Sequence, residues 1–357
     1  MVMDLSRLEL FLPNNLSRPS VELLLADSNV GHQVRRVALD GFGIGSIKSV
    51  FCIGNAGVLS KNYLIESENR RLVLKARSVY DGLSSRMSEE IVLTSRLKAS
   101  GLPVPDALLA LEDKYVYEAF GSVWACFRYC TGNYFQGHSG ELEAAASSYA
   151  ALSYALRQNS VGLGEFDEGR IISDLAELVF STTNPPDCDP MMAALYLRHR
   201  EELLQVIELV TVAQESLEAR CQLMHTDFHP LNVLMDDRRV SAILDFEDVK
   251  VYPVSAASGF AAYKLIRQSL LGVPACGRLS EARKLVDCWL MEWSTVMASQ
   301  HLNMRALGEG ALYRVLALLH LMMDAWLRRG DHRFNFDFQK QLVSLREIRV
   351  IFDLRWC

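Results

Sequence analysis

Residues 225–232 read His-Thr-Asp-Phe-His-Pro-Leu-Asn, and residues 245–248 read Asp-Phe-Glu-Asp. These two motifs are the most informative part of the chain. Short apolar runs flank them at 222–224, 233–235 and 240–244. Such runs favour short strands that leave the polar residues between them on loops. A loop can direct several side chains at one place, and we therefore expect the chemistry of this chain on these two loops.

The polar residues of the motifs suit the transfer of a phosphoryl group to an alcohol. Asp227 can orient an acceptor hydroxyl and accept its proton. Asn232 and Asp245 offer an amide oxygen and a carboxylate, the kind of ligand that Mg²⁺ combines with phosphate oxygens. His225 is expected to brace the loop. For His229 two roles stay open: it approaches the transferred phosphate, or it bonds a backbone carbonyl.

Residues 71–76 form an apolar strand pattern that contains a single lysine, Lys75. A lysine in such a strand is rarely buried without a partner. Glu89 and Glu90 are the candidate partners, because they lie near the start of the next predicted helix, 84–100. The alternative is an edge-strand lysine that faces solvent.

Residues 54–62 precede that strand and contain Gly57, Ser60 and Asn62. They match neither a Gly-x-Gly-x-x-Gly loop nor a Gly-x4-Gly-Lys-Ser/Thr loop. Their backbone N–H groups and polar side chains could still donate to phosphates. Taken alone, the stretch also fits an ordinary hairpin turn.

Composition restricts the class of protein. The chain has 357 residues, half of them hydrophobic and 22% charged, with a net charge of −6. This balance argues against a nucleic-acid binder. We expect a cytoplasmic protein without a signal peptide, a membrane span or paired cysteines. Residues 258–357 hold 14 Lys and Arg against 9 Asp and Glu, an excess of +5.

The order of patterns predicts an α+β fold in two parts: a β-rich lobe at 1–130 and a helical lobe with the catalytic loop at 131–357. Expected strands lie at 46–52, 62–66, 71–76 and 123–129, with a hairpin of 107–111 and 115–120. Expected helices lie at 21–26, 34–39, 84–100, 141–158, 191–219 (as one helix or two), 258–271, 281–298, 311–329 and 336–351.

Together, these motifs resemble the aminoglycoside phosphotransferase and choline kinase superfamily, which includes type II homoserine kinases. Further residues contribute to the resemblance: Gly57 to Tyr63, Leu72 to Lys75, Glu90, Gly101 to Pro105, and Tyr129 to Gly132. The resemblance implies a protein-kinase-like fold with two lobes, ATP and Mg²⁺ as cofactors, and a small molecule with a hydroxyl group as acceptor.

The resemblance also implies roles for single residues. Lys75 would orient the phosphates and pair with Glu90, which its spacing from the Pro103–Pro105 segment favours over Glu89. Asn232 and Asp245 would hold Mg²⁺. The backbone at Tyr129 and Cys130 would meet the adenine.

The chain departs from the family pattern at three places. Thr226 and Leu231 stand where the family usually has Gly, and the Asp often found several residues after the Asp-Phe-Glu segment is missing from 252–258.

The acceptor stays open among a hydroxy-amino acid, a sugar, an amino alcohol and an aminoglycoside. Two other functions are weighed against this one: an inactive nucleotide-binding protein on the same fold, and a protein kinase, which the missing Gly-x-Gly-x-x-Gly argues against.

Overall fold

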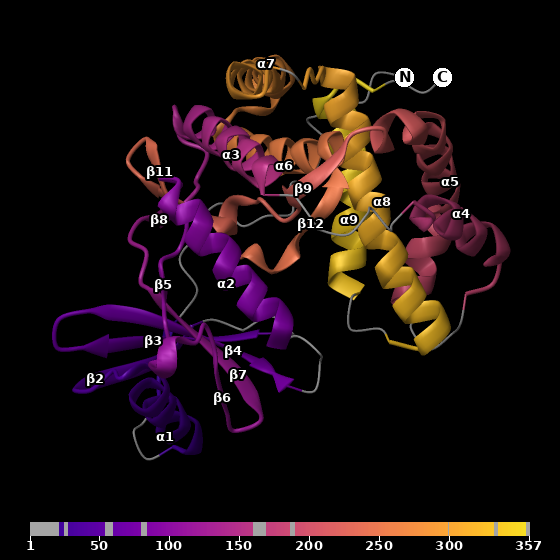
Figure 1. Ribbon diagram of the computed structural model, residues 1–357. Coiled ribbons are helices and arrows are strands. Elements are labelled where there is room, and N and C mark those ends of the chain that lie inside the picture. Colours follow the sequence, from indigo (N-terminus) through magenta and orange to yellow (C-terminus); the bar gives the residue numbers. More distant parts are fainter. Residues whose placement is uncertain are drawn as a thin grey trace. The chain divides into compact units, whose positions relative to one another are not determined.

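The computed structural model of the chain describes residues 21–24, 28–53, 60–79, 84–159, 169–185, 190–298, 300–331 and 335–354. They form two compact units. We call Leu16–Phe135 with Leu231–Glu247 the sheet unit, and Gln136–Pro230 with Asp248–Cys357 the helical unit. The predicted α+β class is confirmed (Figure 1).

The main sheet of the sheet unit is antiparallel throughout and has the strand order β1-β2-β3-β4-β7-β5, with β6 also paired to β7. The hairpin of β3 and β4 turns at a polar segment, as the sequence predicts. The strands are β1 (Val21–Leu23), β2 (Ile47–Ile53), β3 (Ser60–Ser67), β4 (Arg71–Ser78), β5 (Ala107–Leu108), β6 (Tyr117–Ala119) and β7 (Ser122–Arg128).

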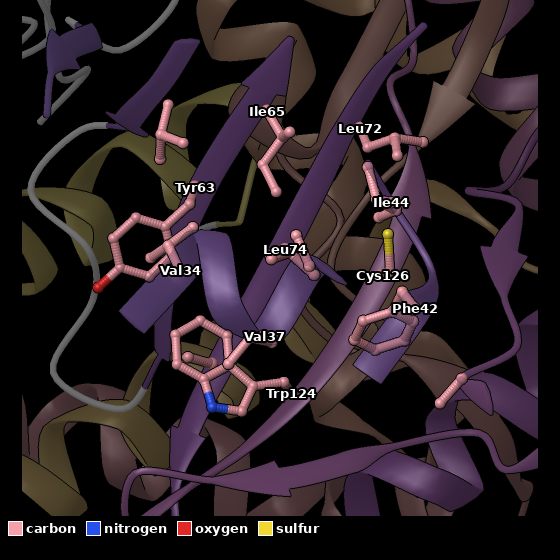
Figure 2. Packing of buried hydrophobic residues seen from close by; sticks show 14 residues of the cluster. Val34, Val37, Phe42, Ile44, Tyr63, Ile65, Leu72, Leu74, Trp124 and Cys126 are labelled. Atoms are coloured by element: carbon pink, nitrogen blue, oxygen red, sulfur yellow. The ribbon is translucent and has the colours of Figure 1, made fainter. Parts of the chain in front are cut away.

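One face of this sheet packs against α1 (Asn29–Arg36) and the π-helical turn that follows it at Val37–Gly41. Figure 2 shows the contact, in which Val34 and Val37 meet Tyr63, Leu74 and Trp124. Successive side chains of a strand point to opposite faces. The apolar residues of β4 on this face therefore leave its other positions, Lys75 among them, on the opposite face.

The helix α2 (Ser84–Ala99) covers part of that opposite face. Its buried residues Met87, Glu90, Ile91 and Thr94 recur at helical spacing and form one stripe. Met87 and Ile91 pack against Val123 and its neighbours on β7. Glu90 belongs to the same stripe, and so it is directed at the sheet.

A second, three-stranded sheet in the sheet unit has the order β11-β10-β8, from β8 (Asn133–Tyr134), β10 (Val233–Asp236) and β11 (Arg239–Ile243). Gly132 precedes β8 with φ +125°, and a Cβ there would lie 2.7 Å from the Met235 carbonyl oxygen. Only glycine permits this approach. The pairing of β8 with β10 differs from the expected division after residue 130, since it joins Leu231–Glu247 to the sheet unit.

The helical unit contains seven helices among the described residues and one pair of strands. The strands β9 (Cys221–His225) and β12 (Val249–Pro253) are antiparallel. The helices are α3 (Glu141–Gln158), α4 (Ile171–Ser181), α5 (Pro190–Glu218), α6 (Val254–Ser269), α7 (Arg278–Val296), α8 (Met304–Arg329) and α9 (Asn335–Ile351).

The helices α6 and α8 cross closely because small residues face each other. A Cβ on Gly259 would collide with the Leu307 backbone, and one on Gly310 with the Ser255 backbone. The crossing fixes α6 beside the strand β12 that precedes it. By length and composition, α8 could cross a membrane, but 72% of its most apolar window is buried inside the structure, as in a core helix.

Several predicted elements were wrong. Residues 21–26 were expected to be helical, but Val21–Leu23 pairs with β2. So short an apolar run cannot be distinguished by its periodicity. The expected hairpin of 107–111 and 115–120 does not form, because β5 and β6 both pair with β7. The strand β12 and the helix α4 were missed.

Candidate active site

Lys75 is the centre of a cluster of charged side chains in the sheet unit. Its Nζ atom lies 3.5 Å from Glu90 Oε1, 3.0 Å from Asp245 Oδ1 and 3.1 Å from Glu247 Oε2. The Lys75 side chain is only 10% exposed. The structure thus brings together three predicted site residues, Lys75, Glu90 and Asp245. Glu89, the other candidate partner, is exposed on α2.

The three carboxylates keep Lys75 charged. Burial lowers the pKa of Lys75, but Glu90, Asp245 and Glu247 raise it, and the net pKa is above its ordinary value. A charged ammonium among several carboxylates can exchange one of them for a phosphate oxygen. This arrangement therefore suits the binding of a phosphorylated ligand.

Arg77 is a member of the cluster that the sequence analysis missed. One guanidinium nitrogen, Nη2, donates to Glu90 Oε2 at 2.8 Å and to Glu247 Oε2 at 2.6 Å. Arg77 follows Lys75 by two positions on β4, and both side chains therefore lie on the same face of the sheet. This period-two spacing is the signal that could have found it. Glu247, also missed, is the third residue of the Asp-Phe-Glu segment.

Asp245 adopts a left-handed backbone conformation with φ +60°. Residues other than Gly rarely adopt it, although Asp tolerates it better than most, and such outliers gather at functional sites. Only Leu244 separates Asp245 from β11, and the Leu244 N–H donates to the Asn232 carbonyl at 2.8 Å. The strands β10 and β11 thereby fix the backbones of both predicted metal ligands next to each other.

The donor set of Asn232 and Asp245 fits a magnesium ion that takes its other ligands from phosphate and water. Mg²⁺ is usually held by one or two carboxylates plus substrate phosphates. No group of three or more His, Cys, Asp or Glu side chains that could hold a metal ion occurs among the described residues. The Asn232 side chain is buried, which limits the directions from which it can be reached.

Gly57, Ser60 and Asn62 were also predicted to contact the nucleotide. Gly57 lies outside the described residues. The backbone of Ser60 pairs opposite Arg77, and Asn62 lies directly opposite Lys75, so Asn62 shares the face of the sheet that carries the cluster. Of the residues on β3 that were expected to contact the nucleotide, Asn62 is therefore the best placed to bind it together with Lys75.

Tyr129 and Cys130 lie in the segment between β7 and β8. The Tyr129 N–H donates to the Arg71 carbonyl at 3.1 Å, and its ring faces the Arg71 guanidinium at 5.9 Å. Tyr129 also lines an open depression of about 480 Å³ near the turn between β3 and β4. Lys75 does not line this depression. The predicted contact of the Tyr129 and Cys130 backbone with the adenine stays a prediction.

In the helical unit, β9 delivers the loop with Asp227, and buried residues hold this loop. The Asp227 N–H donates to His225 Nδ1 at 3.3 Å, and the Tyr149 hydroxyl donates to the His225 carbonyl at 3.0 Å. Phe228 is buried, with its ring 4.6 Å from that of Tyr149. His225 thus braces the backbone of the loop, as the sequence analysis expects.

The neighbours of the Asp227 carboxylate favour its ionised form. Its Oδ2 atom lies 3.3 Å from His229 Nε2, and 40% of its side chain is exposed. Burial raises the pKa of Asp227, but His229, His225 and Arg314 lower it, to a net value of about 2. His229 therefore contacts the carboxylate of its own loop.

Thr226 fits the loop through its hydroxyl group, at a position where glycine was the family expectation. The hydroxyl donates to Asp248, whose backbone oxygen lies at 2.7 Å and whose Oδ2 lies at 2.6 Å. Arg314 Nη2 donates to the same Oδ2 at 2.7 Å. Asp248 thus ties the loop to β12 and α8. Leu231, at the other position where glycine was expected, is 42% exposed.

Comparison with known proteins agrees with this constellation. A model of the phosphotransferase enzyme family matches residues 53–263. None of the curated proteins compared with the chain matches it.

Solved structures of similar fold include a spectinomycin phosphotransferase, APH(9)-Ia, in complex with ADP and spectinomycin. It is 12% identical, with a TM-score of 0.66 over 90% of this chain and 97% of that one. Amicoumacin kinase hAmiN in complex with AMP-PNP, Ca²⁺ and Ami is 15% identical, with a TM-score of 0.59 over 92% and 94% of the two chains.

A thermostable mutant of aminoglycoside phosphotransferase APH(4)-Ia, in a ternary complex with AMP-PNP and hygromycin B, is 18% identical. Its TM-score is 0.56 over 89% of this chain and 98% of that one. At these identities the likeness is one of fold.

Proposed function

The chain belongs to the phosphotransferase enzyme family, and on that premise we propose that it is an ATP-dependent kinase of a small molecule. The γ-phosphoryl group of ATP passes to a hydroxyl group of the acceptor, the bond between its phosphorus atom and the β–γ bridging oxygen breaks, and ADP leaves. The observation that supports this most strongly is the ion-paired set of Lys75, Glu90 and Asp245 in the sheet unit. It supplies a fixed cation for phosphates and a carboxylate for their metal ion.

In the proposed reaction, Lys75 binds phosphate oxygens of the nucleotide, and Glu90 keeps the ammonium group in position. Asn62 is a further donor on the same face of the sheet. Asn232 and Asp245 hold Mg²⁺, which neutralises phosphate charge when it is bound. Positioning and electrostatic stabilisation account for most of the catalysis of phosphoryl transfer, and these residues supply both.

Asp227 acts on the acceptor. Its carboxylate accepts a hydrogen bond from the acceptor hydroxyl, which orients the oxygen toward the phosphorus atom. As the new O–P bond forms, the hydroxyl proton becomes acidic and passes to Asp227. A carboxylate with a pKa of about 2 is a weak base, and so this proton moves late. His229 holds the carboxylate in place rather than contacting the phosphate.

Nucleotide binding is tested by the thermal unfolding of the purified protein with ATP, in the presence and absence of Mg²⁺. A ligand at a hundred times its Kd stabilises the native state by about 2.7 kcal/mol. We expect ATP to raise the melting temperature in a Mg²⁺-dependent way. The variants Lys75→Met and Asp245→Asn should lose most of the shift, whereas Lys98→Met, which changes an exposed lysine on α2, should keep it. An ATP shift that is independent of Mg²⁺ and of Asp245 would contradict the proposed donor site.

A further inference from the structure

Lys264 is a buried cation on α6 for which the reaction described above has no use. It keeps 9% of its surface exposed. Its ammonium group lies 4.9 Å from the ring centre of Phe260 and 5.0 Å from that of Tyr263. Among the residues that the structure describes, none forms a hydrogen bond or an ion pair with this ammonium. Lysine is seldom buried without such a partner.

The charges around Lys264 are mostly positive. Arg267 lies one helical turn along α6, and Lys340 is on α9. The nearby carboxylate of Glu347 is already engaged, since the Arg267 Nε and the Tyr263 hydroxyl both donate to its Oε2 atom at 2.5 Å. Burial lowers the pKa of Lys264, and Lys340 and Arg267 lower it further, to about 7.

Asp227 belongs to the same electrostatic group. Together with Glu347, it partly opposes the fall in the pKa of Lys264. Lys264 and the Asp227 carboxylate both belong to the helical unit, and the carboxylate raises the pKa of Lys264. A compact molecule that offers its hydroxyl to Asp227 can therefore carry a second polar group toward Lys264.

Several buried oxygens near Lys264 also have no hydrogen-bond partner among the described residues. They are the Oε1 atoms of Gln268, which follows Lys264 by four positions on α6, and of Gln341 and Glu347 on α9. Buried polar atoms normally have partners. A ligand that carries both an anionic group and hydroxyl groups would give the Lys264 ammonium an acceptor and would give these oxygens donors.

We propose that Lys264 and Lys340 form a subsite for an anionic group of the phosphoryl acceptor, a carboxylate or a phosphate. This inference rests on the proposed function and narrows its acceptor to a small hydroxylated anion. A polycationic aminoglycoside would meet repulsion from both lysines, and like charges placed against a wrong ligand are an effective means of rejecting it.

The test measures acceptor binding without nucleotide, by thermal shift and calorimetry, on matched compounds. Glycerate and glycerol 3-phosphate are compared with glycerol, and hydroxy-amino acids with their amides. Kanamycin represents the polycations. We expect the compounds that carry a carboxylate or a phosphate to bind. Comparing glycerate with glycerol 3-phosphate shows which of the two anions binds more tightly. Lys264→Met should weaken this binding by at least about tenfold, the loss expected for a hydrogen bond to a charged group.

Two variants serve as controls. Lys284→Met removes a lysine of α7 that is 71% exposed and pairs with Glu281, and it should leave acceptor binding unchanged. Lys264→Arg keeps the positive charge and should retain part of the affinity. Since a buried charge costs stability, Lys264→Met should melt no lower than the wild type, and a loss of binding cannot then be ascribed to unfolding.

The inference is overturned if no anionic compound binds, if kanamycin binds in preference, or if Lys264→Met binds the anions as tightly as the wild type. The thermal shift with ATP and Mg²⁺ needs no acceptor and tests the proposed kinase function separately. A Mg²⁺-dependent ATP shift together with any of these three outcomes leaves the kinase function standing and removes the anionic acceptor.

Discussion

Lys75 Nζ and Asp245 Oδ1 lie 3.0 Å apart although 170 positions separate the two residues in the chain. The strand β4 supplies the lysine, and the loop after β11 supplies the carboxylate. Both strands belong to the sheet unit, and the contact joins its first part to the segment that returns at Leu231–Glu247. A nucleotide phosphate and its metal ion can use both groups at once.

Replacing Lys75 is expected to reduce catalysis more than stability. Lys75→Met removes the cation that faces the phosphates, and we expect kcat/KM for ATP to fall on the order of a hundredfold or more. Asp245 and Glu247 are about one-third exposed and can be solvated after the change. Steady-state kinetics with ATP checks this, with Lys98→Met as the matched control. Wild-type kinetics in Lys75→Met would refute the assigned role.

Replacing Arg77 is expected to reduce stability more than catalysis. Its side chain is only 3% exposed and is bound to Glu90 and Glu247. Arg77→Met leaves the buried Glu90 with a single cation, and we expect a loss of about 3 kcal/mol in the free energy of unfolding. Urea denaturation of the wild type and the variant measures it. Arg77→Lys should lie between the two, because one ammonium rarely bridges both carboxylates with the same geometry.

Thr226→Val should destabilise the catalytic loop. The substitution keeps the shape of the side chain but removes the hydroxyl that donates to Asp248. Asp248 is 40% exposed and keeps its hydrogen bond from Arg314, and the loss of one ordinary hydrogen bond costs about 0.5–1.5 kcal/mol. Thr226→Ser keeps the hydroxyl and should unfold close to the wild type in urea. Equal stability of the Val and Ser variants would show that the hydrogen bond contributes nothing.

The fold class and the pairing of Lys75 with Glu90 were predictable from the sequence, since the apolar run at 71–76 predicted a strand that contains Lys75 and the spacing from the Pro103–Pro105 segment favoured Glu90. Arg77 was not predicted because a sequence motif specifies single positions. That two cations share Glu90 is determined by tertiary packing. The segment Val21–Leu23 became a strand only through its pairing with β2. Lys264 carries no sequence signal, because its burial results from the packing of α6.

The pH dependence of acceptor use should report on Lys264. Its pKa of about 7 means that the ammonium is protonated below pH 7 and neutral above it. The charged groups that act on it are Lys340, Arg267, Glu347 and Asp227. We expect kcat/KM for an anionic acceptor to fall as the pH rises through about 7. Lys264→Arg stays charged and should remove this limb. A fall of kcat/KM that persists in Lys264→Arg would show that another group titrates.

Phosphoryl transfer itself is the central claim, and ³¹P NMR of reactions with ATP, Mg²⁺ and a panel of hydroxylated compounds tests it most directly. The panel contains anionic, neutral and polycationic members. We predict a new phosphate ester resonance with an equal amount of ADP for at least one acceptor. Asp227→Asn should form the ester about a hundredfold or more slowly. The absence of any ester with the wild type, or an equal rate of ester formation in Asp227→Asn, would contradict the account.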